Sequence, residues 1–236
     1  MSKHIWLITG SNRGIGLETA KQLLDSPENV VLATCRKPSQ ATALAQLAES
    51  APGRLHVIEL DTNDDASVRQ SVEQASSIVG DSGIDYLINN AAINEGMGTV
   101  SSTMDLDILT REFRVNVLGP ARVYQAYLPL VAKSQKKTVV NMSSRLGSIG
   151  NNCGTLYTTY SITKTALNML TYKEHAERPD LVFIAMDPGH LKTELGGPTA
   201  VLEVSVGVKG VLNVIGRLQA EDSGKFFSFR GEVHPW

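Results

Sequence analysis

The sequence predicts an α/β protein with one doubly wound sheet, in which seven parallel strands carry helices on both faces. Two patterns predict this fold: short β-branched runs alternate with longer helical segments, and a glycine-rich turn directly follows the first run. The runs are nearly continuous apolar stretches, as expected for strands covered on both sides. We therefore expect ligands to bind beyond the carboxyl ends of the strands.

The strands are expected where apolar, β-branched runs are short. Seven such runs occur, at residues 5–9, 30–34, 55–60, 86–89, 138–142, 182–186 and 225–229. Between them, apolar residues recur every three or four positions, which is typical of helices packed on a sheet. These helices are predicted at residues 16–24, 41–49, 65–79, 106–131 and 159–177.

One segment, at about residues 194–216, lies outside the alternation and is rich in glycine and valine. Two interpretations stay open, a helical flap over the site or a plain pair of surface helices. Neither a repeat nor a Pro- or Ser-rich linker divides the chain, so a single domain over residues 1–236 is predicted.

Composition indicates a globular protein without a nucleic-acid or membrane surface. Hydrophobic residues make up 42% of the chain, and the formal net charge is −2 with both signs scattered, so no basic footprint is present. The two cysteines, Cys35 and Cys153, are far apart, which favours a reduced protein over a disulfide framework. With no predicted signal peptide or membrane span, a cytoplasmic location is expected.

The turn after the first strand, TGSNRGIG at residues 9–16, predicts a phosphate-binding site. Glycines let the backbone approach a pyrophosphate closely, and the helix that follows offers unpaired N–H groups and a positive dipole end. The alternative is a merely tight strand-to-helix connection. The candidate residues in this turn are Gly10, Asn12, Arg13, Gly14, Ile15 and Gly16.

The end of the second strand indicates which dinucleotide would bind. A site for NAD normally has an acidic residue here for the ribose hydroxyl, but the sequence is Thr34-Cys35-Arg36-Lys37. Arg36, together with Arg13, can make charge-assisted hydrogen bonds to a 2′-phosphate, so NADP(H) is predicted. The alternative is a pair of solvated surface arginines.

Polar residues also end the third and fourth strands. Asp61 and Thr62 place a carboxylate where an adenine amino group would lie, and Asn89, Asn90 and Ala91 follow the fourth strand. Taken singly, each is an ordinary start of a loop.

Tyr160 and Lys164 place a phenol and an ammonium on one helix face, about one turn apart. The pair alone is a weak signal, but its context strengthens it. Ser143 and Ser144 end the fifth strand upstream, and Asn116 lies in the long helix before that strand, beside the Gly-Pro pair at 119–120.

With these motifs in order, the chain resembles the short-chain dehydrogenase/reductase family over nearly its whole length. The resemblance rests on TGSNRGIG, Asp61, the NNA triplet at 89–91, Asn116, the serine pair, YSITK at 160–164, and Pro188-Gly189 followed by Thr193. Within the family, the run at 143–149 and the ending at 224–236 resemble the C-factor or sniffer-like carbonyl reductase branch.

The resemblance implies a Rossmann fold and hydride transfer between a nicotinamide and a carbonyl carbon, without a metal. Tyr160 would give its proton to the carbonyl oxygen, Ser144 would hydrogen-bond that oxygen, Lys164 would hold the ribose, and Asn116 would order a relaying water. A neighbouring ammonium and an oxidised nicotinamide would bring the pKa of the phenol down. Further cofactor contacts implied are Arg13, Ile15, Arg36, Asp61, Thr62, Asn89, Ala91, Tyr160, Lys164, Pro188, Gly189, Leu191 and Thr193.

Some features depart from the family pattern. Ala92 replaces the glycine that usually follows NNA, and sixteen positions separate Ser144 from Tyr160, so the loop between them carries an insertion. This leaves Ser143, Ser144 and Ser148 open as the catalytic serine, with Ser144 preferred as the second of the strand-end pair. Candidate pocket residues are Met97, Leu146, Tyr157, His190 and Leu195, whereas the histidines show no metal-ligand spacing and are interpreted as surface or structural.

The leading hypothesis is an NADPH-dependent reductase of aldehydes or ketones. Two alternatives are an NAD-linked alcohol dehydrogenase and a non-catalytic, NADPH-binding regulatory protein. The expected partners are a small carbonyl substrate and a second copy of the chain, as a homodimer or homotetramer, with neither nucleic acid nor membrane. The sequence does not name the natural substrate.

Overall fold

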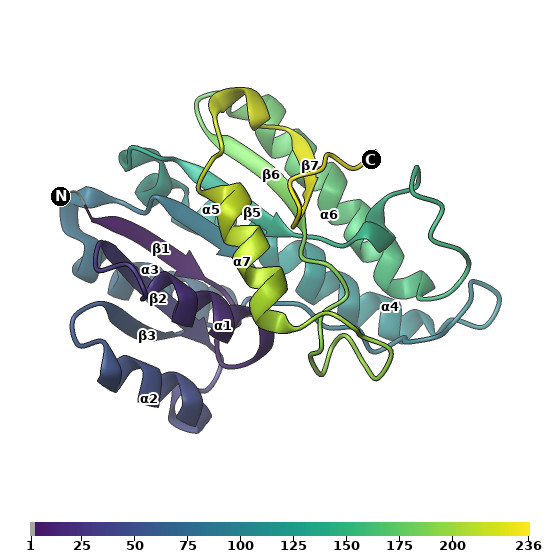
Figure 1. The fold of residues 1–236 in the computed structure, drawn as a ribbon, viewed down its shortest axis with the longest axis horizontal. Coiled ribbons are helices and arrows are strands. Elements are labelled where there is room, and N and C mark those ends of the chain that lie inside the picture. The colour runs from purple at the N-terminus through teal and green to yellow at the C-terminus, as the bar shows by residue number, and fades with distance from the viewer. Residues whose placement is uncertain (1–2) are drawn as a thin grey trace.

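The structure is a computed structural model that describes residues 3–236, and its centre is one parallel sheet. The strand order is β3-β2-β1-β4-β5-β6-β7 (Figure 1). The strands β2 and β3 lie on one side of β1 and the strands from β4 onward lie on the other, so the order of the strands switches between β1 and β4. This topological switch point is where open α/β sheets bind ligands. The strands are β1 (His4–Ile8), β2 (Asn29–Cys35), β3 (Leu55–Glu59), β4 (Tyr86–Asn89), β5 (Thr138–Met142), β6 (Val182–Asp187) and β7 (Lys225–Ser228). All seven predicted strands are confirmed.

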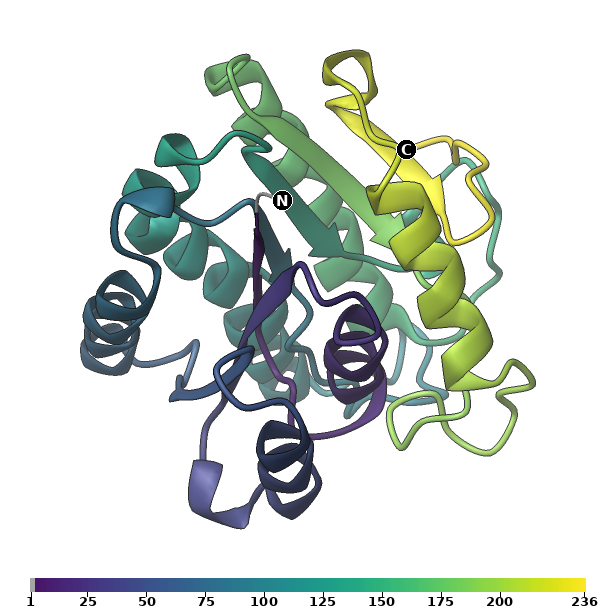
Figure 2. The ribbon, with the colours of Figure 1, turned by 60° about the vertical axis from the view of Figure 1, so that its left-hand side comes forward.

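Helices cover both faces of the sheet (Figure 2). One layer holds α1 (Gly14–Leu23), α2 (Thr42–Ser50) and α7 (Val204–Ile215), and the other holds α3 (Asp65–Val79), α4 (Leu106–Phe113), α5 (Gly119–Lys133) and α6 (Thr158–Glu177). Successive strand side chains point to opposite faces. Trp6 and Ile8 of β1 accordingly lie in the core on the α1 side, whereas Ile5 and Leu7 lie in the core on the α3 side.

The helix predicted over 106–131 is interrupted. A π-helical turn, Arg114–Leu118, separates α4 from α5, and Asn116 lies within it. Such turns leave the ordinary i→i−4 ladder and are frequent at functional sites. The predicted range is therefore helical almost throughout, but the apolar pattern did not reveal the π-helical turn within it.

The segment at 194–216 is helical in only part of its length. It contains one helix, α7, whose apolar side packs into the core through Val208, Val211, Val214 and Ile215. This helix covers the sheet on the α1 side, so it is not a plain surface helix, and the role of the segment as a flap over the site stays a prediction. Glu194 and Leu195 of the irregular stretch before α7, and Val204 at the start of α7, line the cavity described below. Within residues 3–236, the search found no helix long and apolar enough to span a membrane.

Candidate functional site

A cavity of about 560 Å³ opens beyond the carboxyl ends of β1 to β4, at the switch point of the sheet. Its volume lies in the range of small-molecule and cofactor sites. Many residues predicted to bind the cofactor line it, namely Gly10, Asn12, Arg13, Gly14, Ile15, Arg36, Asp61, Thr62, Ala91 and Thr193. The structure thus brings together residues from five separate segments of the chain.

The glycine turn forms the floor of this cavity. Gly10 has φ +70°, and a Cβ there would lie 3.0 Å from the Cα of Ala91. A Cβ on Gly16 would lie 2.4 Å from the carbonyl oxygen of Gly10, so Gly16 lets the first turn of α1 pack against the strand end. No side chain caps the start of α1. Its first N–H groups therefore remain available to an anion, as a phosphate cradle requires.

Cations stand around the rim of the cavity. Arg36 is exposed and lines it, and Lys192 adds a third cation that the sequence analysis did not single out. Arg13 forms an ion pair with Glu194, so it bridges the glycine turn and the stretch after β6. Because both partners are largely exposed, this pair contributes little to stability and is readily exchanged for another anion.

Other predicted cofactor residues do not line the cavity. The Asn89 side chain lies inside the sheet, where its Nδ2 donates to Oδ1 of Asn141 at 2.8 Å. The next residue, Asn90, faces the cavity instead, and its Nδ2 donates to the carbonyl oxygens of Thr9 (2.8 Å) and Gly10 (3.2 Å). Alternation along a strand explains this, because neighbouring residues face opposite ways. The other predicted cofactor residues that do not line the cavity are Gly16, Tyr160, Lys164, Pro188, Gly189 and Leu191.

The Tyr160 and Lys164 pair lies at the start of α6, buried against the end of β5. Tyr160 is 7% exposed and Lys164 is 2% exposed. Nζ of Lys164 donates to the carbonyl oxygen of Met142 at 2.7 Å and lies 5.4 Å from the centre of the Tyr160 ring. The predicted helical spacing therefore does bring the phenol and the ammonium together.

Burial controls the protonation of both groups. It raises the pKa of Tyr160 above its ordinary value, and the negative charges of Asp187 and Glu112 add to this shift. Burial also lowers the pKa of Lys164 to about 7, which the charge of Glu112 partly offsets. In the protein alone, the phenol pKa therefore moves opposite to the direction expected from an adjacent ammonium, because burial and the two nearby carboxylates all disfavour the phenolate.

The three candidate serines have different partners. Ser143 Oγ donates to Oδ1 of Asn168 at 2.6 Å, and Ser148 Oγ donates to the carbonyl oxygen of Pro235 at 2.6 Å. Ser144 Oγ only accepts a hydrogen bond, from the N–H of Leu146 at 3.2 Å. Its hydroxyl proton is therefore free to bind a further acceptor. The hydroxyl protons of Ser143 and Ser148 are already used in hydrogen bonds.

Asn116 is fully buried in the π-helical turn. Its Oδ1 accepts from the N–H of Ile93 at 2.9 Å, while its Nδ2 donates to the carbonyl oxygen of Ile93 at 2.9 Å and to Oγ1 of Thr163 at 3.1 Å. The side chain thus ties the loop after β4 to the helix that carries Tyr160 and Lys164.

Glu112, one turn before Asn116, is a buried charge that sequence reasoning missed. It is 0% exposed, and its Oε1 accepts from the N–H groups of Glu95 (2.6 Å) and Gly96 (3.0 Å). A glutamate on a helix is usually solvated, so no signal in the sequence distinguished this one.

The structure does not gather the candidate substrate-pocket residues around the cavity. Of the five, only Leu195 lines the cavity. Met97 is exposed and faces Gly197 across the opening, and Nε2 of His190 lies 2.7 Å from the carbonyl oxygen of Gly196. Tyr157 begins α6 with φ +62°, a left-handed conformation that costs energy in a residue with a side chain. No group of three His, Cys, Asp or Glu side chains suited to a metal ion was found in the described chain.

Comparison with known proteins fits this geometry. The family model described as short chain dehydrogenase matches residues 4–200. The C-signal protein of Myxococcus xanthus is 36% identical over 65% of this chain and 93% of its own. Two solved structures each cover 100% of both chains: an NADPH-bound carbonyl reductase from chicken fatty liver (30% identity, TM-score 0.93) and the carbonyl reductase Sniffer of D. melanogaster (28%, TM-score 0.92). The chain therefore belongs to the short-chain dehydrogenase/reductase family of oxidoreductases, in the branch of C-signal and the sniffer-like carbonyl reductases.

Proposed function

We propose that this protein is an NADPH-dependent reductase that converts aldehydes or ketones to alcohols, with Tyr160 as proton donor. The observation that carries the proposal is the buried Tyr160 beside Lys164, at the same edge of the sheet as a glycine-floored cavity with cations on its rim. The likeness to an NADPH-bound carbonyl reductase across the whole chain supports it.

The cavity suits NADPH in its shape and in its charges. The glycine turn and the uncapped start of α1 would hold the pyrophosphate, and Asp61 and Thr62 would lie near the adenine. Arg36 would meet the 2′-phosphate, joined by Arg13 once that phosphate displaces Glu194 from its ion pair. When bound, the cofactor supplies the hydride, and the protein provides position and charge.

A proton donor must hold its proton until the substrate oxygen takes it. The raised pKa of Tyr160 meets this requirement. The free hydroxyl proton of Ser144 would hydrogen-bond the same substrate oxygen and stabilise the negative charge that develops on it. Lys164 would bind the ribose and resupply the proton through a water near Asn116, because a group whose pKa is about 7 exchanges protons readily at neutral pH.

We also propose that two copies pair through α6. Ile162, Met169 and Tyr172 are exposed large apolar residues on this one helix, and Leu118 is exposed on the neighbouring π-helical turn. Light scattering on the purified protein would test this, and a monomer at micromolar concentration would contradict it.

The first experiment measures initial rates of NADPH oxidation, and separately of NADH oxidation, with a panel of aldehydes, ketones and 1,2-diketones. We expect turnover with NADPH that is lost in Tyr160→Phe while NADPH still binds. Tyr172→Phe changes an exposed tyrosine on the same helix and should retain turnover. Unchanged turnover in Tyr160→Phe would refute the mechanism.

A second comparison tests the cofactor choice. Arg36→Ala should lower the preference for NADPH over NADH, whereas Arg69→Ala, an exposed arginine on α3, should not. If the preference is unchanged in Arg36→Ala, the assignment of the 2′-phosphate contact is wrong. An NADH preference in the wild type would instead favour the NAD-linked dehydrogenase, and NADPH binding without any turnover would favour the regulatory protein.

A further inference from the structure

The last residues of the chain fold back beside the site. After β7, the chain turns so that Val233 bridges Phe227 in the antiparallel sense and the N–H of His234 donates to the carbonyl oxygen of Phe226 at 2.7 Å. The rings of His234 and Trp236 both pack on Phe226, at 4.9 and 5.8 Å between ring centres. This packing fixes the imidazole of His234 against the end of β6.

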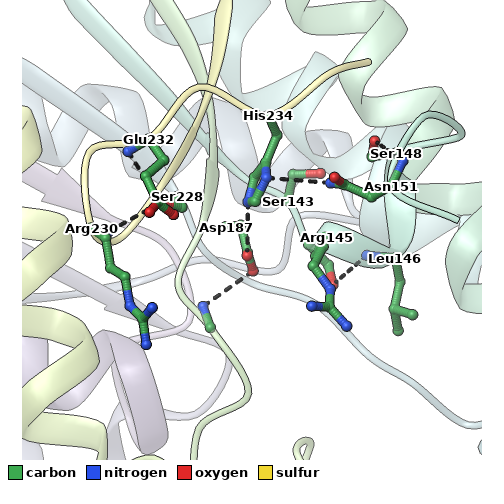
Figure 3. A network of polar contacts seen from close by, with 12 residues as sticks. Ser143, Arg145, Leu146, Ser148, Asn151, Asp187, Ser228, Arg230, Glu232 and His234 are labelled. Atoms are coloured by element: carbon green, nitrogen blue, oxygen red, sulfur yellow. Dashed lines mark hydrogen bonds and ion pairs between the residues drawn. The ribbon is translucent and has the colours of Figure 1, made fainter. Parts of the chain in front are cut away.

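His234 makes polar contacts in two directions (Figure 3). Its Nε2 lies 3.2 Å from Oδ2 of Asp187, and its Nδ1 lies 3.3 Å from Nδ2 of Asn151. Asn151 Nδ2 is a donor and the Asp187 carboxylate is an acceptor, so a neutral imidazole with its proton on Nε2 satisfies both contacts at once. The imidazole and the carboxylate are mostly buried, with side chains 14% and 11% exposed.

Each of these partners belongs to a segment that borders the site. The other oxygen of Asp187, Oδ1, accepts from the N–H of Gly189 at 3.1 Å and so shapes the turn that leads into the cavity wall at Thr193. Asn151 lies in the inserted loop between Ser144 and α6. The backbone N–H of Asn151 donates to Ser148 Oγ at 3.1 Å, and the N–H of Gly150 donates to the carbonyl oxygen of Trp236 at 3.1 Å.

We propose that His234 is a positioning residue that couples the two sides of the active site, by holding the 187–189 turn and the inserted loop at 148–151 in one fixed relation. The inference rests on the proposed function: the turn leads to Thr193, a predicted cofactor contact that lines the cavity, and the loop follows Ser144, which would contact the substrate. Asp187 is also one of the two charges that act on Tyr160, so the group that His234 holds is close enough to influence the proton donor.

The test distinguishes the effect of the two polar contacts of His234 from the effect of its ring packing on Phe226. His234→Phe keeps a ring on Phe226 and removes both hydrogen bonds. We expect the Kd for NADPH and the KM for the carbonyl substrate each to rise about fivefold to tenfold, as loss of a buried hydrogen bond implies. The change in kcat should be smaller, because Tyr160, Lys164 and Ser144 are untouched.

Two conservative variants then show which contact of His234 affects NADPH binding and which affects substrate binding. The amide nitrogen of glutamine can replace Nε2, so His234→Gln should restore NADPH affinity through Asp187. Asparagine replaces Nδ1 better, so His234→Asn should restore the substrate KM through Asn151. A merely structural histidine would show no such division between the two variants.

The matched control is His175→Phe. Nδ1 of His175 lies 2.8 Å from Ser223 Oγ, which also accepts from the N–H of Phe183 near the start of β6, at the opposite end of the strand from Asp187. This variant should lower the melting temperature without changing Kd or KM. If His234→Phe behaves in the same way, or if both parameters stay at wild-type values, the proposal is overturned.

Hydrogen exchange gives a readout that does not depend on activity. His234→Phe should speed amide exchange at Gly189 and at Asn151 together, relative to wild type. If the wild type reduces no carbonyl compound, the proposed function fails, but the exchange result still decides this inference. Acceleration at neither segment, or at one alone, would show that His234 does not couple them.

Discussion

Replacing Lys164 with methionine is expected to stabilise the fold at acidic pH, although it removes a group that the proposed mechanism uses for turnover. Burial lowers the pKa of Lys164 from 10.5 to about 7, a difference of 3.5 units. Such a shift corresponds to a penalty of about 5 kcal/mol on the charged form. Methionine fills a similar space without a charge, but it leaves the carbonyl oxygen of Met142 unpaired, which costs about 1–3 kcal/mol. The net gain at pH 6 should be about 2–4 kcal/mol.

The sign of the pH dependence follows from proton binding. The unfolded chain keeps this lysine protonated up to about pH 10.5, whereas the folded chain releases the proton above about pH 7. Wild-type stability therefore rises with pH between these values, and it is lost as pH falls through 7. The variant has no such group, so its advantage over wild type should shrink by about 2–3 kcal/mol between pH 6 and pH 9.

Urea unfolding of the wild type and of Lys164→Met at pH 6 and pH 9 measures this directly. Lys173→Met provides the control, because Lys173 is exposed on the same helix and should show no gap that varies with pH. A Lys164→Met variant less stable than wild type at pH 6, or a gap equal at both pH values, would refute the reasoning. It would mean that the attraction of Glu112 offsets the cost of burying the Lys164 ammonium.

Three further perturbations have defined outcomes. Burial raises the pKa of Glu174 to about 8, so folded-state stability falls as pH rises from about 4.5 to 8; urea unfolding should show Glu174→Gln gaining on wild type by a few kcal/mol over that range. Gly16→Ala places a Cβ 2.4 Å from the carbonyl oxygen of Gly10 and should abolish NADPH binding in a fluorescence titration, whereas Gly53→Ala, with open space around its Cβ, should bind normally and lose only about 1 kcal/mol of stability. Asn116→Ala removes three buried hydrogen bonds and should cost about 2–4 kcal/mol in urea unfolding; a loss below 1 kcal/mol would contradict its role as a tie between the β4 loop and α6.

The fold was predictable because its signals are local. Each strand is a short β-branched run and each helix has a period near 3.6, so the pattern alone predicted all seven strands and their alternation with helices. Predictions failed where packing overrides the pattern. The π-helical turn at 114–118 keeps the apolar period, and the apolar side of α7 has the same spacing whether it packs on the sheet or covers a site.

Part of the candidate site could also be predicted from the sequence. Tyr160 and Lys164 are four positions apart on one helix, so their proximity is a property of the helix itself. The residues of the glycine turn are also neighbours in the sequence, so their proximity could be predicted in the same way. The choice between Asn89 and Asn90 required the structure, because Asn89 ends the strand, Asn90 directly follows it, and only the sheet decides which of them faces the cavity.

The sequence by itself determined the parts whose geometry arises within a few residues, namely the strand–turn–helix cradle, the cationic end of β2 and the Tyr160–Lys164 pair. The tertiary structure decided which distant groups meet. Glu112 comes close enough to act on the pKa values of Tyr160 and Lys164 only because α4 packs against α6. His234 reaches Asp187 and Asn151 across 47 and 83 positions of the chain. Periodicity and spacing act over single turns of backbone, whereas such long-range contacts depend on the order of strands in the sheet and on how the last segment packs against it.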